Sequence, residues 1–73
     1  MTSGERLRTL RMERGLTQLR LAVAAGTTPS FVNLMERWGY VPGADLRRRI
    51  ASVLGVQESD IWPETLLQEV GRQ

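Results

Sequence analysis

Apolar residues recur along this 73-residue chain three or four positions apart, and no strand-like alternation of useful length interrupts them. Each apolar segment starts near a residue that can cap a helix and stops near a glycine or a proline. The pattern predicts helices near residues 3–14, 18–25, 29–38, 44–54 and 58–62, with one or two further helical turns in 64–70. We therefore expect an all-α fold: one compact five-helix domain.

Three threonines mark the expected helix starts. Thr2 precedes Glu5 by three positions, which is the spacing of a capping box, and Thr17 is placed to cap the second helix. Thr28 is placed to cap the third helix, with Pro29 at the first helical position, where its missing N–H group costs nothing. These starts determine which residues of each helix face the core.

Residues 16–37 have the pattern of two short helices joined by a tight turn. Ala22 must be small because the second helix of the pair crosses close to it, and Gly26 must adopt a positive φ where the chain reverses. The inner faces of the pair are Leu21, Ala22, Ala25, Val32 and Met35. The outward strip of the second helix is Pro29, Ser30, Asn33, Leu34 and Arg37. A helix held outward by its partner in this way fits the major groove of DNA.

The spacing of the pair resembles that of a known family. Counted from Gln18, Ala22 and Gly26 fall fifth and ninth, and Val32 and Met35 fall fifteenth and eighteenth. These spacings are similar to those of the lambdoid phage repressor and Cro (XRE-type) family. The similarity runs without a gap from about Glu5 to Trp62 through Leu16-Thr17-Gln18, Glu36-Arg37, Pro42 and Ile50-Ala51-x-x-Leu54-Gly55-Val56. It implies a repressor-like DNA-binding domain that contains a helix-turn-helix.

Several residues are placed to contact the DNA backbone. The amide of Gln18, together with the free N–H groups of the helix that it opens, can bind a phosphate. Thr28 can bind a phosphate in addition to capping its helix, and the hydroxyl of Tyr40 is placed to donate to one. None of these contacts carries sequence information by itself.

Other residues of the outward strip are suited to the edges of bases. Ser30 and Asn33 are short and polar, and asparagine can pair with N6 and N7 of adenine. Leu34 and the ring of Pro29 suit a thymine methyl group, and Arg37 can reach either a guanine edge or the backbone. The alternative is an ordinary solvated helix face, and the spacing of the helix pair favours the DNA interpretation.

Arg11 lies four residues after Leu7, on the apolar stripe of the first helix, where a charge is costly unless it is paired. Glu36 lies beside the inward Val32 and Met35 and is the obvious partner. A phosphate contact is the alternative role for Arg11. We favour a structural ion pair between Arg11 and Glu36, and the family resemblance favours it too, since similar proteins carry an Arg and a Glu at these places.

Trp38 departs from the family, many members of which have glycine directly after the Glu-Arg pair. We expect the third helix to extend by one residue and to stop at Gly39. By helical angle Trp38 lies nearer the core than the DNA side, next to Phe31. It is therefore expected to cover the core.

Charge adds modest support for a polyanionic partner. Residues 1–37 carry a net charge of +3 and residues 38–73 carry −1, so the helix pair lies in the basic half. The run Arg47-Arg48-Arg49 has low weight, because on a helix its side chains point in three directions. We expect Arg48 to be solvated, and Arg47 and Arg49 to be peripheral phosphate contacts at most.

Composition argues against several classes of protein. The chain has no cysteine and no histidine, which removes disulfides and ordinary zinc sites. Neither paired carboxylates in a plausible pocket nor a glycine-rich phosphate loop is evident, so we expect no enzyme, no cofactor, no metal and no small-molecule ligand. Neither a signal peptide nor a run of membrane-spanning length is evident, so we expect a cytoplasmic protein of a bacterium or phage, associated with the nucleoid.

The function that we expect is sequence-specific binding of double-stranded DNA by a transcriptional regulator, as a repressor or autoregulator. The alternative is a protein-interaction adaptor or an antitoxin whose main partner is a protein. Phage, restriction-modification, antitoxin and plasmid contexts all stay open.

One recognition helix reads few base pairs, so a homodimer on two half-sites is expected. We take residues 1–63 as the DNA-binding domain and 64–73 as a helical tail that can support dimerisation. The candidate dimer surface is Ile61, Trp62, Leu66, Leu67 and Val70. The alternative is that Ile61 and Trp62 complete the core and that the tail after Pro63 is frayed.

Overall fold

The computed structural model describes residues 1–65, and within that range it is helical with no strand. The elements are α1 (Ser3–Glu13), α2 (Gln18–Ala25), α3 (Pro29–Trp38), α4 (Ala44–Leu54) and α5 (Glu58–Ile61). The expected all-α class is confirmed, and only the ends of α1 and α5 differ, each by one residue. No helix in residues 1–65 is long and apolar enough to cross a membrane.

The helix ends follow from local chemistry. The Thr2 hydroxyl accepts the backbone N–H of Glu5 at 3.1 Å, and the Glu5 carboxylate accepts from that hydroxyl at 3.0 Å. The hydrogen bond from the Thr2 side chain, and then the one from its backbone, lower the pKa of Glu5 below its ordinary value. Thr17 and Thr28 cap α2 and α3 in the same way, at 3.0 and 3.2 Å. Gly26 ends α2 with a φ of 73°, as the tight turn requires.

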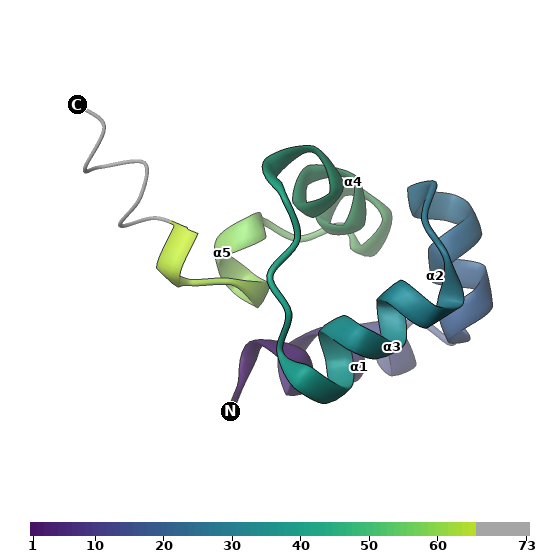
Figure 1. The fold of residues 1–73 in the computed structure, drawn as a ribbon, viewed down its shortest axis with the longest axis horizontal. Helices are drawn as coiled ribbons and strands as arrows, with labels where there is room; N and C mark the ends of the chain where they lie inside the picture. Colours follow the sequence, from purple (N-terminus) through teal and green to yellow (C-terminus); the bar gives the residue numbers. More distant parts are fainter. Residues whose placement is uncertain (66–73) are drawn as a thin grey trace.

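The helices surround one core and support α3 from one side. α3 packs on α1 and α2, α4 packs on α2, and α5 closes the core against α1 and α4. In Figure 1, α3 lies along the edge of the molecule in front of α1, with α2 at one end and α5 at the other. The long outer side of α3 is therefore available to a partner.

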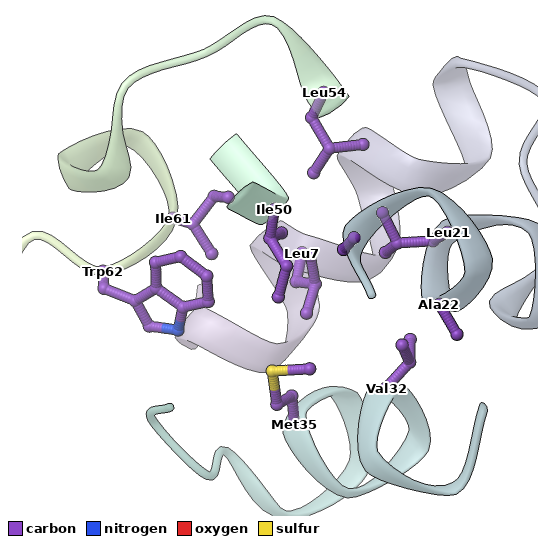
Figure 2. Packing of buried hydrophobic residues seen from close by; sticks show 10 residues of the cluster. Leu7, Leu21, Ala22, Val32, Met35, Ile50, Leu54, Ile61 and Trp62 are labelled. Carbon is purple, nitrogen blue, oxygen red and sulfur yellow. The ribbon is translucent and has the colours of Figure 1, made fainter. Parts of the chain in front are cut away.

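The core is built from the inward faces that the pattern predicts. Ile50 of α4 and Leu7 of α1 lie at its centre in Figure 2, between α5 and α2. Ala22 points toward Val32 where α2 meets α3, which explains why the position must be small. The buried cluster is Leu7, Leu21, Ala22, Ala25, Val32, Met35, Ile50, Leu54, Ile61 and Trp62.

Ile61 and Trp62 belong to this core and are not a dimer surface. Trp62 is only 1% exposed, and its indole fills the end of the core beside Ile61 (Figure 2). A small domain needs such bulk to exclude water, so neither side chain is accessible to a second copy. The other residues of that expected surface, Leu66, Leu67 and Val70, lie outside the described residues. The buried Thr65 donates its hydroxyl to the carbonyl of Trp62 at 2.8 Å.

Arg11 and Glu36 form the expected ion pair and join α1 to α3. Nε of Arg11 lies 2.6 Å from Oε2 of Glu36, and Nη2 lies 3.0 Å from Oε1. The two side chains are 11% and 4% exposed. Nη1 of Arg11 also donates to the Leu16 carbonyl at 2.7 Å, and Gln18 donates to Oε1 of Glu36 at 3.2 Å. The desolvated charges are thus paired and hydrogen-bonded, which is what makes burying them tolerable.

Arg47 holds the segment before α4 and the start of α5 together. Its Nε donates to Oε1 of Glu58 at 3.2 Å, and its Nη1 donates to the Pro42 carbonyl at 2.9 Å. The low weight given to Arg47 as a phosphate contact agrees with this arrangement, because its guanidinium is engaged within the fold. Arg48 and Arg49 are exposed and share Asp45, each at 3.7 Å.

Gly4 permits the close crossing of α1 over α3. A Cβ atom at this position would lie 2.8 Å from the carbonyl oxygen of Met35 and closer still to that of Glu36. Both neighbours are backbone atoms and cannot rotate away. Sequence patterns do not reveal this requirement, because it depends on which helix lies against the first turn of α1.

We predict that Gly4→Ala lowers the free energy of unfolding by about 1 to 3 kcal/mol, because the added methyl group forces the two helices apart. The loss should appear even though alanine favours a helix over glycine by about 1 kcal/mol. Gly43→Ala is the control without a steric clash, since a Cβ there meets nothing within 4 Å, and its expected cost is only that of replacing the N-cap of α4. Thermal or urea unfolding measures the stability of both variants. A Gly4→Ala variant as stable as the unaltered chain would contradict the steric argument.

We predict that Arg11→Ala destabilises the fold by about 3 kcal/mol, because it leaves the more deeply buried carboxylate with Gln18 alone. Glu36→Ala should cost less, since Arg11 keeps its bond to the Leu16 carbonyl and lies nearer the solvent. The double variant should lose less than the sum of the two. Urea unfolding of all four chains measures the coupling, and strictly additive losses would show that the pair contributes none.

Candidate nucleic-acid interface

The outer face of α3 is exposed where the sequence predicts an outward strip. Val32 and Met35 are buried on the opposite side, so the helical period turns the strip away from the core. Thr28 stands at the start of this face with its hydroxyl bound to the backbone N–H of Phe31. The exposed residues of the strip are Pro29, Ser30, Asn33, Leu34 and Arg37.

Gln18 is directed toward α3 rather than outward from the start of α2. Its Nε2 lies 3.2 Å from Oε1 of Glu36 and 3.4 Å from Oδ1 of Asn33. The side-chain amide that we expected to bind a phosphate therefore connects α2 to the middle of α3. The N–H groups of Gln18 and Leu19 remain available there, because a helix start has no internal acceptors for them, whereas the N–H of Arg20 is bound by Thr17.

A polar hollow lies beside α3, between α1 and α2. It is lined by Arg8, Arg11, Gln18, Asn33, Glu36 and Arg37. Arg11 and Glu36 are engaged with each other, whereas Arg8 and Arg37 are exposed. Sequence reasoning missed Arg8, although its place three residues before Arg11 puts both on the same face of α1.

The arginines differ in whether a carboxylate neutralises them. Within residues 1–65, ion pairs engage Arg11, Arg14, Arg47, Arg48 and Arg49. No acidic residue of that range forms an ion pair with Arg6, Arg8, Arg20 or Arg37. The uncompensated positive charge thus lies on α1, α2 and α3, and two of its members border the hollow beside the strip.

Trp38 does not cover the core. Its side chain is 73% exposed, and the guanidinium carbon of Arg37 lies 5.7 Å from the centre of its ring. The chain reverses at Gly39, and the ring of Tyr40 packs against Phe31 with centroids 5.2 Å apart. The expectation from helical angle is wrong because Tyr40, rather than Trp38, takes the place beside Phe31.

The outer face of α2 carries a second, apolar surface. Leu19 and Val23 are 58% and 71% exposed, and with Leu16, Arg20 and Ala24 they line a shallow groove. This groove shares no lining residue with the polar hollow beside α3. α2 therefore supports α3 with one face and offers an apolar face to solvent with the other.

Comparison with known proteins agrees with this arrangement. Residues 4–61 match a family model described as a helix-turn-helix domain. An immunity repressor protein of Bacillus phage phi105 is 40% identical over 70 residues, which cover 94% of this chain and 49% of that protein. The chain thus spans about half the length of this curated relative. Given the match over α1 to α5, the chain belongs to the helix-turn-helix family of the phage repressor and Cro type.

Proposed function

We propose that this protein is a sequence-specific regulator of transcription that binds double-stranded DNA with α3 in the major groove. The observation that carries the proposal is the exposed strip of α3, which ends at Arg37 and has Arg8 beside it; neither arginine forms an ion pair within residues 1–65. Such a helix can approach base edges while positive charge beside it contacts the phosphates. Repression by occupying a promoter is the proposed mode, and the similarity to a phage immunity repressor supports it. The DNA of a bacterial nucleoid is the proposed target.

The proposed contacts divide into two kinds. Asn33, Ser30 and Leu34 lie on the exposed strip and would read base edges in the groove, together with the ring of Pro29. Backbone contacts would come from Arg8, Thr28, Tyr40 and the N–H groups at the start of α2 where Gln18 lies. Arg37 borders the hollow and can serve either kind.

We predict that Asn33→Ala lowers affinity for a duplex selected from a random library by about 1 to 3 kcal/mol, and hardly changes affinity for random DNA. Arg8→Ala is the matched control, because a phosphate contact carries no sequence information. It should weaken both duplexes equally and reduce the salt slope by about 1. Fluorescence anisotropy at several salt concentrations measures all of these quantities.

Two results would contradict the proposal. If Asn33→Ala lowers the affinity for selected and for random DNA equally, Asn33 takes no part in base recognition. An unaltered chain whose affinity for DNA is negligible at low salt, or does not fall with rising salt, would remove DNA as the partner, since phosphate contacts release counterions. Unfolding curves of each variant serve as the control for intact structure.

An adaptor or antitoxin is the second candidate function, and the apolar face of α2 is the observation that favours it. Leu19 and Val23 are exposed side by side, as in a surface that receives another protein. Such binding would depend weakly on salt, so the experiment above separates the two candidates. Retention of DNA binding by Val23→Ser would show that the α2 face is not needed for the proposed function.

We further propose that the protein binds DNA as a homodimer, because one helix reads too few base pairs for specificity in a genome. With Ile61 and Trp62 in the core, the remaining candidates for the interface are Leu66, Leu67 and Val70. The full chain should sediment as a dimer on a duplex with two half-sites. The double substitution Leu66→Ser and Leu67→Ser should weaken this assembly. A wild-type chain that stays monomeric with and without DNA at high micromolar concentration would contradict the proposal.

A further inference from the structure

We propose that Trp38 is a positioning residue that holds the guanidinium of Arg37 in the orientation in which it meets DNA. The inference rests on the proposed function and extends it to a residue where the chain departs from the family pattern. The observation is the cation–π contact at the end of α3: the guanidinium carbon of Arg37 lies over the Trp38 ring, 5.7 Å from its centre. A cation at this distance from an indole face is attracted by the electron density of the ring.

Arg37 benefits from such a partner because no acidic residue within 1–65 forms an ion pair with it. The neighbouring carboxylate, Glu36, is occupied by two nitrogens of Arg11 and by the amide of Gln18. Arg8 lines the same hollow and carries the same charge. An exposed arginine without a fixed partner samples many rotamers, and ordering it on binding lowers affinity. The indole limits that sampling before DNA arrives.

Trp38 is available for this role because the fold does not use its ring. The side chain is 73% exposed, and the place beside Phe31 is taken by Tyr40. The buried core contains the other tryptophan, Trp62, and the cluster is complete without Trp38. The contact with the Arg37 guanidinium accounts for a large aromatic ring that lies in solvent.

The first test uses the chain without DNA. Protons of the Arg37 side chain above the indole should resonate upfield of their ordinary positions, because the ring current shields them. Trp38→Ala should abolish this shift, and Trp38→Phe should keep a smaller one. Neither change should alter the melting temperature appreciably, since the ring is exposed. An unshifted Arg37, or a loss of stability typical of a core residue, would overturn the proposal.

The second test is a double-variant cycle on a selected duplex. Trp38→Ala should weaken binding by about two- to fivefold, the range expected for an exposed cation–π pair, and Trp38→Phe should restore part of the loss. In the Arg37→Ala background, Trp38→Ala should have almost no further effect. Val23→Ala, which removes an equally exposed apolar side chain on the outer face of α2, is the control and should not change binding.

The outcomes separate this inference from the proposed function. If Trp38→Ala weakens binding equally with and without Arg37, the ring contacts DNA itself and the positioning role is wrong. The inference is also overturned if Trp38→Ala leaves affinity unchanged. If the unaltered chain binds no duplex, the proposed function fails and this inference fails with it, whatever the resonance of Arg37 shows.

Discussion

The orientation of α3 depends on one buried carboxylate. Glu36 is 4% exposed and accepts hydrogen bonds from Arg11 of α1 and from Gln18 of α2, so it joins three helices at one point. Its neighbour along the helix, Arg37, faces outward, and Met35 on its other side is buried. Anchoring Glu36 therefore fixes the rotation of α3 about its own axis. That rotation decides which side chains of α3 reach a partner. Apolar packing at this place would give similar stability but would fix the rotation of α3 less closely, which explains the presence of a charged pair.

Sequence was most informative where the governing interactions are local. Thr2, Thr17 and Thr28 cap their helices as expected, because a cap involves only the next three residues. The pairing of Arg11 with Glu36 was also predictable, since a charge on an apolar stripe requires a partner. The requirement for glycine at position 4 was not predictable, because it comes from the backbone of α3, which would clash with any side chain there. Trp38 was misplaced because helical angle ignores the turn that returns Tyr40 to Phe31.

At the candidate site, too, the sequence alone does not show which charged side chains are free to bind a partner. Counting residues gave a small excess of arginine in the first half of the chain, which is weak evidence for any partner. Pairing is more informative, because Asp45 and Glu58 engage the three consecutive arginines of α4, while Arg8 and Arg37 border the hollow beside the exposed strip. The compact run, which is the most conspicuous basic feature of the sequence, is thus partly neutralised: Arg47 is engaged within the fold, and Arg48 and Arg49 share one carboxylate. A sequence count cannot distinguish these cases, because the distinction lies in contacts between helices.

The hydrogen bond between Gln18 and Asn33 has a consequence for discrimination between base pairs. At 3.4 Å it is a long bond, and Nε2 of Gln18 has a closer acceptor in Glu36 at 3.2 Å. A base edge that engages both polar atoms of the Asn33 amide would therefore exchange a weak internal contact for two stronger ones. A mismatched edge that engages only Oδ1 would exchange this contact for a single one and gain little. Breaking the internal bond costs the same at every site where Oδ1 is used, so discrimination comes from the number of hydrogen bonds that the base edge gives in return.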